Sequence, residues 1–354
     1  MKLRVGYVPY SKDLSHPADR RRLAFWAQQV GIELNVSSPL ESDILILSNA
    51  ANFGYWIRRA KQPVIIDLVD GYLAEKSNFL QDILRNFSRS LAGQSGFHWV
   101  SYKFHIRVAC QRSAAVIVAS PEQRDLVLPF NSQTYVILDS HAEVSNFAQH
   151  NSGENTNNSQ QLFWEGFGYT LKHFEVIAEE LDQFLFDSGW GMYMVTQSEF
   201  PRWGGYIGKV HTQKEVRKLF PKSWHAIRII PWSIENLRTY SELATIGLIP
   251  LNQSDLFANM KSENKLLSMW QLNLPVLFSP TPAYLRVASM ANVEIGVVQL
   301  REWYKKLIYL SENPEVVDNL KLKGHHYVDK YHTTEVLIRS WTEALSQTIN
   351  TSNL

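Results

Sequence analysis

The polar residues most suited to chemistry lie just before an apolar helical pattern in the second half of the chain. They are Lys261, Ser262, Glu263, Asn264 and Lys265, and we expect a helix over residues 261–272. A helix N-terminus offers unpaired N–H groups and the positive end of the helix dipole, which together bind anions. Two lysines there oppose the dipole unless an anion is present, and the serine and asparagine can cap the helix. The segment predicts a phosphate site, with a capped surface helix as the alternative.

A glycine and a lysine six residues apart mark the end of an earlier apolar run. Gly166 closes the expected strand in FWEGFGYTLKHF, Phe167 follows it, and Lys172 lies in the first turn of the next expected helix. A lysine at this position can bind an anionic group, or it can be an exposed first-turn residue. Trp232, after the strand in IRIIPW, can stack on a ligand or pack in a core. Ser268 can bond a hydroxyl or simply pack within its helix.

Two further candidates follow strands in the first half of the chain. Asp70 comes after the apolar run PVIIDLV and can accept a hydrogen bond from a ligand or serve as a turn residue before glycine. His16, in the loop after the first strand, can contact a ligand or cap a helix. The basic run Arg20 to Arg22 beside it is expected to be a solvated face. Asp67 and Asp70 are three apart on a strand end, so they project to opposite faces and form no metal pair.

Strand-length apolar runs alternate with helical patterns in both halves, which is typical of parallel, doubly wound sheets. The expected strands span residues 3–8, 32–36, 43–47, 63–69, 114–119, 135–138, 162–165, 192–196, 226–231, 244–251, 275–279 and 293–298. The main expected helices span residues 20–30, 53–60, 75–91, 121–128, 171–186, 213–220, 234–242, 261–272 and 284–290, with further helices from 303 to about 349. Residues 252–260 are expected to be a polar loop. Ligands bind at the carboxyl ends of strands in such sheets, where the candidates lie.

The polar segment AQHNSGENTNNSQQ divides the chain in two. We therefore expect an N-terminal Rossmann-like domain over 1–147, a linker over 148–161 and a second Rossmann-like domain over 162–330. Residues 331–354 are expected to form a helix that returns to the N-terminal domain. Apolar residues including Trp341 recur along it at intervals of about four, and such a stripe needs an apolar cover.

Composition narrows the class of protein and its compartment. Lys and Arg number 35 against 34 Asp and Glu, so no nucleic-acid partner is expected. Cys110 is the only cysteine, which excludes a disulfide framework and a thiolate metal cluster. The chain has no apolar run long enough to span a membrane, and its N-terminus indicates a strand and not a signal peptide. A cytoplasmic protein is expected. The aromatic stretch 93–105 is expected to contact an acceptor or the inner face of a membrane through Phe97, Trp99, Tyr102 and Phe104.

The second half, roughly residues 160 to 345, resembles GT-B glycosyltransferases of family four, also called group one. The resemblance rests on FWEGFGYTLKHF, IRIIPW, TIGLIPLN, the KSENKLL loop, LPVLFSPTPAY and a tail of helices led by REW. Three positions depart from the family pattern. Met260 and Ser268 stand where the family has its Glu-x7-Glu pair, and Phe167 stands where it has an arginine. The first half resembles the family less closely.

The resemblance implies an α/β fold of two Rossmann-like domains facing across a cleft, with the C-terminal helices crossing back to the first. It implies a metal-independent enzyme of the hexosyltransferase class, without a cofactor, that moves a sugar from a nucleotide-sugar donor to an acceptor hydroxyl with retention of configuration. The acceptor would be a saccharide or a lipid-linked molecule. The implied donor-binding residues are Gly166, Phe167, Lys172, Trp232, Lys261, Ser262, Glu263, Asn264, Lys265 and Ser268. The implied acceptor-binding residues are His16 and Asp70, and the implied catalytic residues are Asp70 and Lys172.

A second hypothesis belongs to another class. The missing glutamates and the phenylalanine at position 167 favour a non-catalytic GT-B-like protein that binds a nucleotide or a carbohydrate. The two hypotheses differ in whether a nucleotide sugar is turned over.

Overall fold

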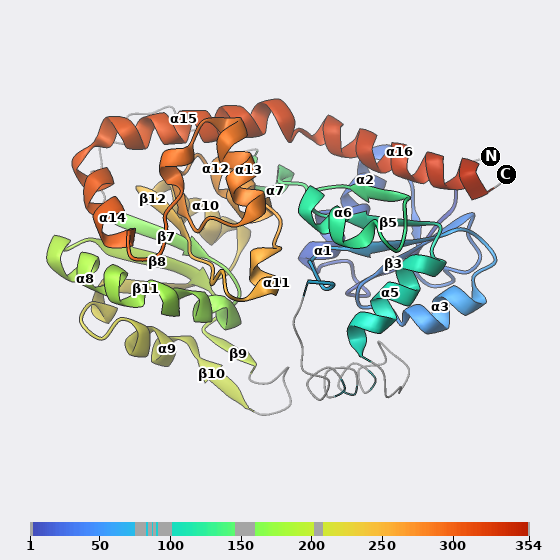
Figure 1. Cartoon of the computed structure of the whole chain (residues 1–354), viewed down its shortest axis with the longest axis horizontal. Coiled ribbons are helices and arrows are strands. Elements are labelled where there is room, and N and C mark those ends of the chain that lie inside the picture. The colour runs from blue at the N-terminus through green and yellow to red at the C-terminus, as the bar shows by residue number, and fades with distance from the viewer. Residues whose placement is uncertain are drawn as a thin grey trace. The chain divides into compact units, whose positions relative to one another are not determined.

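The computed structural model describes residues 3–74, 101–145, 160–201 and 208–352, together with positions 83, 87 and 90. By their contacts the residues form two compact units, coloured by chain position in Figure 1. Unit 1 consists of Met1–Ser140, Asp255–Ser262 and His332–Leu354, and unit 2 of His141–Ser254 and Glu263–Tyr331. Most of the expected linker, residues 148–159, lies outside the described part of the chain, so the expected domain boundaries stay a prediction.

Unit 1 is built on a parallel sheet of six strands in the order β2-β1-β3-β4-β5-β6. Its strands are β1 Val5–Val8, β2 Leu34–Asn35, β3 Ile44–Ser48, β4 Val64–Leu68, β5 Ala115–Val118 and β6 Thr134–Val136. Its described helices are α1 Pro17–Arg20, α2 Leu23–Val30, α3 Phe53–Arg59, α5 Tyr102–Arg112, α6 Pro121–Val127, α11 Leu256–Asn259 and α16 Thr334–Ser352. The strand order reverses at β1 and β3, and ligands bind outside the carboxyl ends at such a point.

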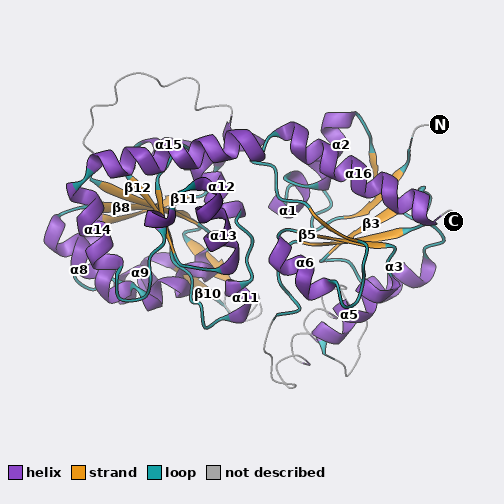
Figure 2. Cartoon of the chain, turned by 45° about the horizontal axis from the view of Figure 1, so that its top comes forward, coloured by secondary structure: helices purple, strands orange, loops and turns teal. Residues whose placement is uncertain are grey.

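Successive residues of these strands pack on opposite faces of the sheet. Ile44 and Ile46 join one apolar core with Trp26 of α2, whereas Leu45 joins another with residues of α3 and α5. Trp341 of α16 completes the first core and is fully buried. Figure 2 shows α16 lying beside α2 on this face. The prediction that the C-terminal helix returns to the N-terminal sheet is confirmed, because its apolar stripe covers strand residues that water would otherwise reach.

Unit 2 has a parallel sheet of five strands in the order β11-β8-β7-β12-β13, and a separate antiparallel hairpin. The strands are β7 Gln161–Glu165, β8 Gly191–Thr196, β11 Ile227–Pro231, β12 Ile246–Ile249 and β13 Val276–Phe278, and the hairpin is β9 Glu199–Pro201 with β10 Lys209–His211. The helices are α7 Ala142–Ser145, η1 Gly168–Val176, α8 Ala178–Ser188, α9 Thr212–Leu219, η3 Trp224–Ala226, α10 Ile234–Glu242, α12 Asn264–Gln271, α13 Pro282–Ala291, η4 Glu294–Gly296, α14 Trp303–Glu312 and α15 Pro314–Tyr331.

The order in unit 2 reverses at β7 and β12, and α12 connects β12 to β13. Helix α15 packs along α12 and α13 (Figure 2). The ring of Trp270 on α12 meets Tyr327 of α15 edge to face, with the ring centres 5.9 Å apart. This packing fixes the helix whose N-terminus carries the candidate anion site.

Four expected elements differ from the structure. Residues 293–298 form the 3-10 helix η4 and a single bridge instead of a strand, because local hydrogen bonds close a tight turn there. The expected loop 252–260 contains α11, which the Asp255 side chain caps. The expected helix 171–186 is the 3-10 helix η1 followed by α8. The expected helix 20–30 begins only at Leu23, because the backbone of Arg22 is not helical.

Of the aromatic stretch 93–105, only residues 101–105 are described. Tyr102 begins α5 and is buried, and its hydroxyl donates to Oδ1 of Asn49 at 2.7 Å. The expectation that this ring faces a partner is therefore wrong, since the helix turns it onto the sheet. Phe104 is 52% exposed. No helix among the described residues combines the length and the apolar character needed to cross a membrane.

Candidate functional site

In unit 2 the carboxyl end of β7 meets the first turn of α12. The Nζ of Lys265 donates to the carbonyl oxygen of Glu165 at 2.7 Å and lies 3.8 Å from its Oε1. A Cβ at Gly166 would lie 2.8 Å from the Trp164 ring and 3.0 Å from this Nζ, so only glycine leaves room. The ammonium is therefore fixed where the strand order reverses, beside a helix N-terminus. These are the two features that favour an anion.

The N-cap residue of α12 is not one that the sequence predicts. Glu263 occupies the N-cap position without a side-chain cap, so the prediction that Ser262 or Asn264 caps the helix is wrong. The buried Glu263 carboxylate instead accepts a hydrogen bond from Nη2 of Arg286 at 2.8 Å. Of the two lysines, only Lys265 lies in the first turn. Lys261 and Ser262 group with unit 1, although the sequence placed them on the donor side.

The other donor-side candidates in unit 2 differ in their exposure to solvent. Phe167 follows β7, is 44% exposed and stacks on Tyr169 with the ring centres 5.5 Å apart. Lys172 is exposed on η1, whereas Ser268 is buried on α12. Trp232, directly after β11, is 37% exposed, which leaves part of its ring open to a ligand. The roles of these residues in donor binding stay predictions.

In unit 1 the loop after β1 is held by a buried carboxylate. Oδ1 of Asp19 accepts from the Tyr7 hydroxyl at 2.6 Å and from the Tyr10 N–H at 2.9 Å, and Oδ2 accepts from the Ser11 N–H at 2.9 Å. His16 caps α1 and stacks on Tyr10, with the ring centres 4.7 Å apart. Burial lowers the pKa of His16. Capping, one of the two sequence interpretations, is thus observed, and the acceptor role stays a prediction.

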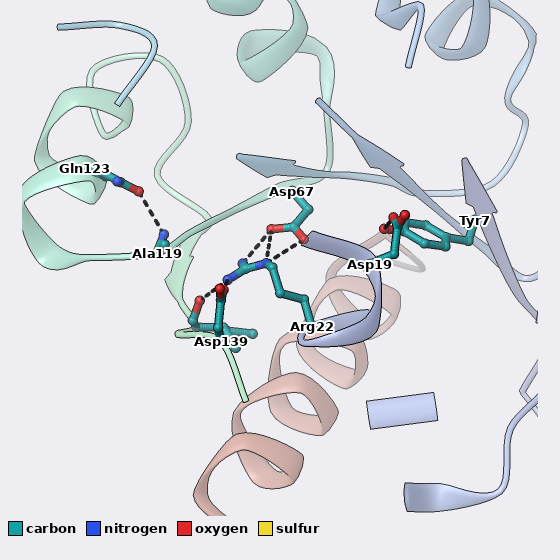
Figure 3. Close-up of polar contacts among 8 residues, drawn as sticks. Tyr7, Asp19, Arg22, Asp67, Ala119, Gln123 and Asp139 are labelled. Atoms are coloured by element: carbon teal, nitrogen blue, oxygen red, sulfur yellow. Dashed lines mark hydrogen bonds and ion pairs between the residues drawn. The ribbon is translucent and has the colours of Figure 1, made fainter. Parts of the chain in front are cut away.

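A buried arginine joins the end of β4 to the segment after β6, as Figure 3 shows. The Arg22 guanidinium donates to Asp67 at 2.6 Å and 2.9 Å, to Oδ1 of Asp139 at 3.0 Å and to the carbonyl of Ile137 at 2.7 Å. Burial disfavours its charge, but Asp67 and Asp139 outweigh burial, and the pKa of Arg22 lies above its usual value. Its carbon Cζ lies 5.9 Å from the ring centre of Trp341. The expectation that residues 20–22 form a solvated face is wrong for Arg22.

The sequence contains one signal for a buried cation in unit 1. Asp67 lies inside the apolar strand PVIIDLV, and a carboxylate buried there requires a cation. The three arginines of the run 20–22 were therefore candidates for this cation, although the sequence does not distinguish among them.

Asp70 follows β4 in the same unit and is partly buried. Burial raises the pKa of its carboxyl group, the Lys261 ammonium counteracts this, and Asp139 adds to the rise. Gln123 attaches the segment that carries Lys261 to the sheet, because its Nε2 donates to the carbonyl of Met260 at 2.9 Å. Its Oε1 accepts from the N–H of Ala119, directly after β5, at 2.9 Å (Figure 3). Unit 1 thus brings a carboxyl group and an ammonium group together after β4. Among the described residues, no group of His, Cys, Asp or Glu is placed to hold a metal ion.

Two Rossmann-like units with these sheets define the GT-B fold of glycosyltransferases, and similar solved structures share it at low identity. HepE from Anabaena, in complex with UDP and glucose, has a TM-score of 0.60 and 10% identity over 98% of this chain and 100% of its own. An α-glucosyltransferase in complex with UDP and a 13-mer DNA has a TM-score of 0.59 and 11% identity, over 98% and 100%.

TarM has a TM-score of 0.59 and 10% identity over 85% of this chain. The chain covers 54% of TarM, or about half of that protein's length. No protein-family model and no curated protein matches the sequence.

Proposed function

We propose that the protein transfers a sugar, of the hexose class, from a nucleotide-sugar donor to an acceptor hydroxyl. The observation that carries this is the Lys265 ammonium, fixed 2.7 Å from the Glu165 carbonyl beside the N-terminus of α12. UDP is bound to two of the similar structures, so UDP-sugars are the first donors to test. The acceptor is a saccharide or a lipid-linked molecule.

In this proposal unit 2 holds the donor. Lys265 and the N–H groups at the start of α12 bind the diphosphate, Lys172 stabilises the leaving charge, and Trp232 stacks on the base. In unit 1, Asp70 and His16 contact the acceptor. Transfer proceeds with retention, and the leaving phosphate assists in deprotonating the incoming hydroxyl. The protein then contributes orientation and charge stabilisation.

The competing hypothesis is a protein of this fold that binds a nucleotide or a carbohydrate without turnover. Met260 and Ser268, at the positions of the family's glutamates, and Phe167, at the position of its arginine, favour it. The buried Glu263 does not replace those glutamates, because its carboxylate is engaged by Arg286.

The two hypotheses are separated by incubating the protein with a panel of nucleotide sugars and acceptor saccharides and measuring released nucleoside diphosphate. If the protein transfers sugar, release of the nucleoside diphosphate should depend on the acceptor and should fall in Lys265→Gln. This substitution removes the positive charge but keeps a hydrogen-bond donor. Lys305→Gln, on the exposed face of α14, is the matched control and should be unaffected. Binding of a nucleoside diphosphate without turnover of any nucleotide sugar would overturn the proposal. NMR of the product's anomeric proton then tests retention.

A further inference from the structure

Unit 2 contains a hollow of about 470 Å³ between η1, the β9–β10 hairpin and α9. Lys172, which we assign to the donor, lies at one side of it, and the other lysines of its lining have no role in the proposed reaction. We call this hollow the basic groove. Its charged lining consists of Lys172, Lys209, Lys214 and Lys218, the carboxylates Glu175 and Glu215, and His211. With the histidine neutral, cations outnumber anions in a chain whose net charge is only +1.

The walls of the basic groove are fixed by specific contacts. Gly168 presses against Phe200 of β9, where a Cβ would overlap the ring. The Gly168 N–H donates to Oε1 of Gln197 at 2.9 Å, and the N–H of Thr212, the first residue of α9, donates to the carbonyl of Ser198 at 2.9 Å. The same short connection after β8 therefore holds both η1 and α9. These contacts hold η1, β9 and α9 against one another around the groove.

The positive charge in the groove is only partly neutralised. Lys209 lies 3.4 Å from Glu199, which also pairs with His211 at 2.9 Å. Lys214 and Lys218 are four residues apart on α9, so they share one face of the helix and repel each other. Neither has an ion-pair partner among the described residues. An anion bound between them would relieve this repulsion.

We propose that the basic groove binds an anionic saccharide, that is, a sugar chain bearing carboxylate or phosphate groups. The exposed lysines provide charge-assisted hydrogen bonds to the acidic groups. Glu175 and Glu215 can accept hydrogen bonds from sugar hydroxyls, and they would repel a continuous polyanion such as a nucleic acid. Tyr169, which also lines the groove and is 53% exposed, offers an aromatic face to the C–H face of a sugar ring. The proposal does not depend on glycosyl transfer, because binding can be measured without a donor.

The test is calorimetric titration of the full chain with a galacturonic acid hexasaccharide, with maltohexaose as the neutral chain of equal length, and with galactose 1-phosphate. The hexauronate should bind, maltohexaose should bind at least about tenfold more weakly, and the difference should shrink between about 0.05 M and about 0.5 M NaCl. The relative affinity of the uronate and the sugar phosphate shows whether carboxylate or phosphate is preferred. If neither binds, or if the neutral chain binds equally well, the proposal is overturned.

Variants locate the site. Lys214→Glu combined with Lys218→Glu should weaken binding of the preferred anionic ligand roughly tenfold or more, since two charge-assisted contacts are lost. Lys305→Glu, an exposed lysine of the same unit on α14, is the matched control and should change binding little. The melting temperature confirms folding of each variant. UDP should bind the double variant as it binds the wild type. If UDP displaces the saccharide, or binds the double variant more weakly, the groove is part of the donor site and the proposal is wrong.

Discussion

Replacing Arg22 with methionine tests whether the buried ion pair of unit 1 is required for stability. Arg22 has no exposed surface and Asp67 is 1% exposed, whereas Asp139 is 17% exposed. Methionine fills a similar volume but leaves the Asp67 carboxylate buried without a cation. Asp139 can still be reached by water, so the main loss is expected at Asp67.

Removing one partner of a buried ion pair costs about 3–5 kcal/mol, because the remaining charge stays desolvated. Loss of the contact between the guanidinium and the Trp341 ring adds about 0.5–1 kcal/mol. At roughly 2–4 °C per kcal/mol, this loss should lower the melting temperature of Arg22→Met by about 7–24 °C. Arg112→Met, an exposed arginine of α5, should change stability by less than about 0.5 kcal/mol.

The loss should depend on pH in a defined direction. Burial already raises the pKa of Asp67 in the presence of Arg22, and removing Arg22 raises it further. The unfolded chain has a carboxyl pKa of about 3.9. A group whose pKa is raised on folding contributes stability below its unfolded pKa and loses it as pH rises through the folded pKa. The deficit of Arg22→Met relative to the wild type should therefore be largest near pH 7 and shrink toward about pH 4.

Urea unfolding followed by fluorescence at several pH values measures this deficit. Adding Asp67→Leu should restore at least half of the loss, because the second change removes the unpaired charge. A loss below about 1 kcal/mol, or a deficit independent of pH, would refute the reasoning from the buried ion pair.

Three further predictions concern other parts of the fold. Lys172→Ala should lower transfer by about 10- to 1000-fold if it stabilises leaving charge, and a rate equal to that of the Lys305→Ala control would remove it from the site. Trp341→Ala should lower the free energy of unfolding in urea by about 3–5 kcal/mol. A chain that ends near Lys330 should be unstable or turn over its substrate slowly, and full stability of that chain would contradict the role of α16. Gly166→Ala should destabilise the folded chain by about 1–3 kcal/mol and raise the KM for the donor, because the new Cβ meets Trp164 and the Lys265 ammonium. An unchanged KM would argue against Lys265 as a donor contact.

The sequence by itself determined the architecture of both sheets. The runs ILIL of β3 and AVIV of β5 are apolar on both faces, which occurs where helices cover a parallel sheet on both sides. The helical patterns between the strands had the required length. The apolar residues that recur at intervals of about four along α16 predicted that this helix covers the N-terminal sheet. The glycine at 166 and the lysine at 265 were both recognised as candidates, because local patterns place them at a strand end and a helix start.

Only the tertiary structure decided which polar groups face each other. Arg22 and Asp67 are 45 residues apart in sequence, and no local pattern distinguishes the buried arginine from its half-buried neighbours Arg20 and Arg21. Likewise, Glu263 and Lys265 are two residues apart, yet one turns inward to Arg286 and the other reaches the end of β7. The residue propensities and the apolar periodicity of a sequence indicate which face of a helix or strand is apolar. The pairing of charges depends on how distant elements pack, because a buried charge is stable only where the fold brings it an opposite charge.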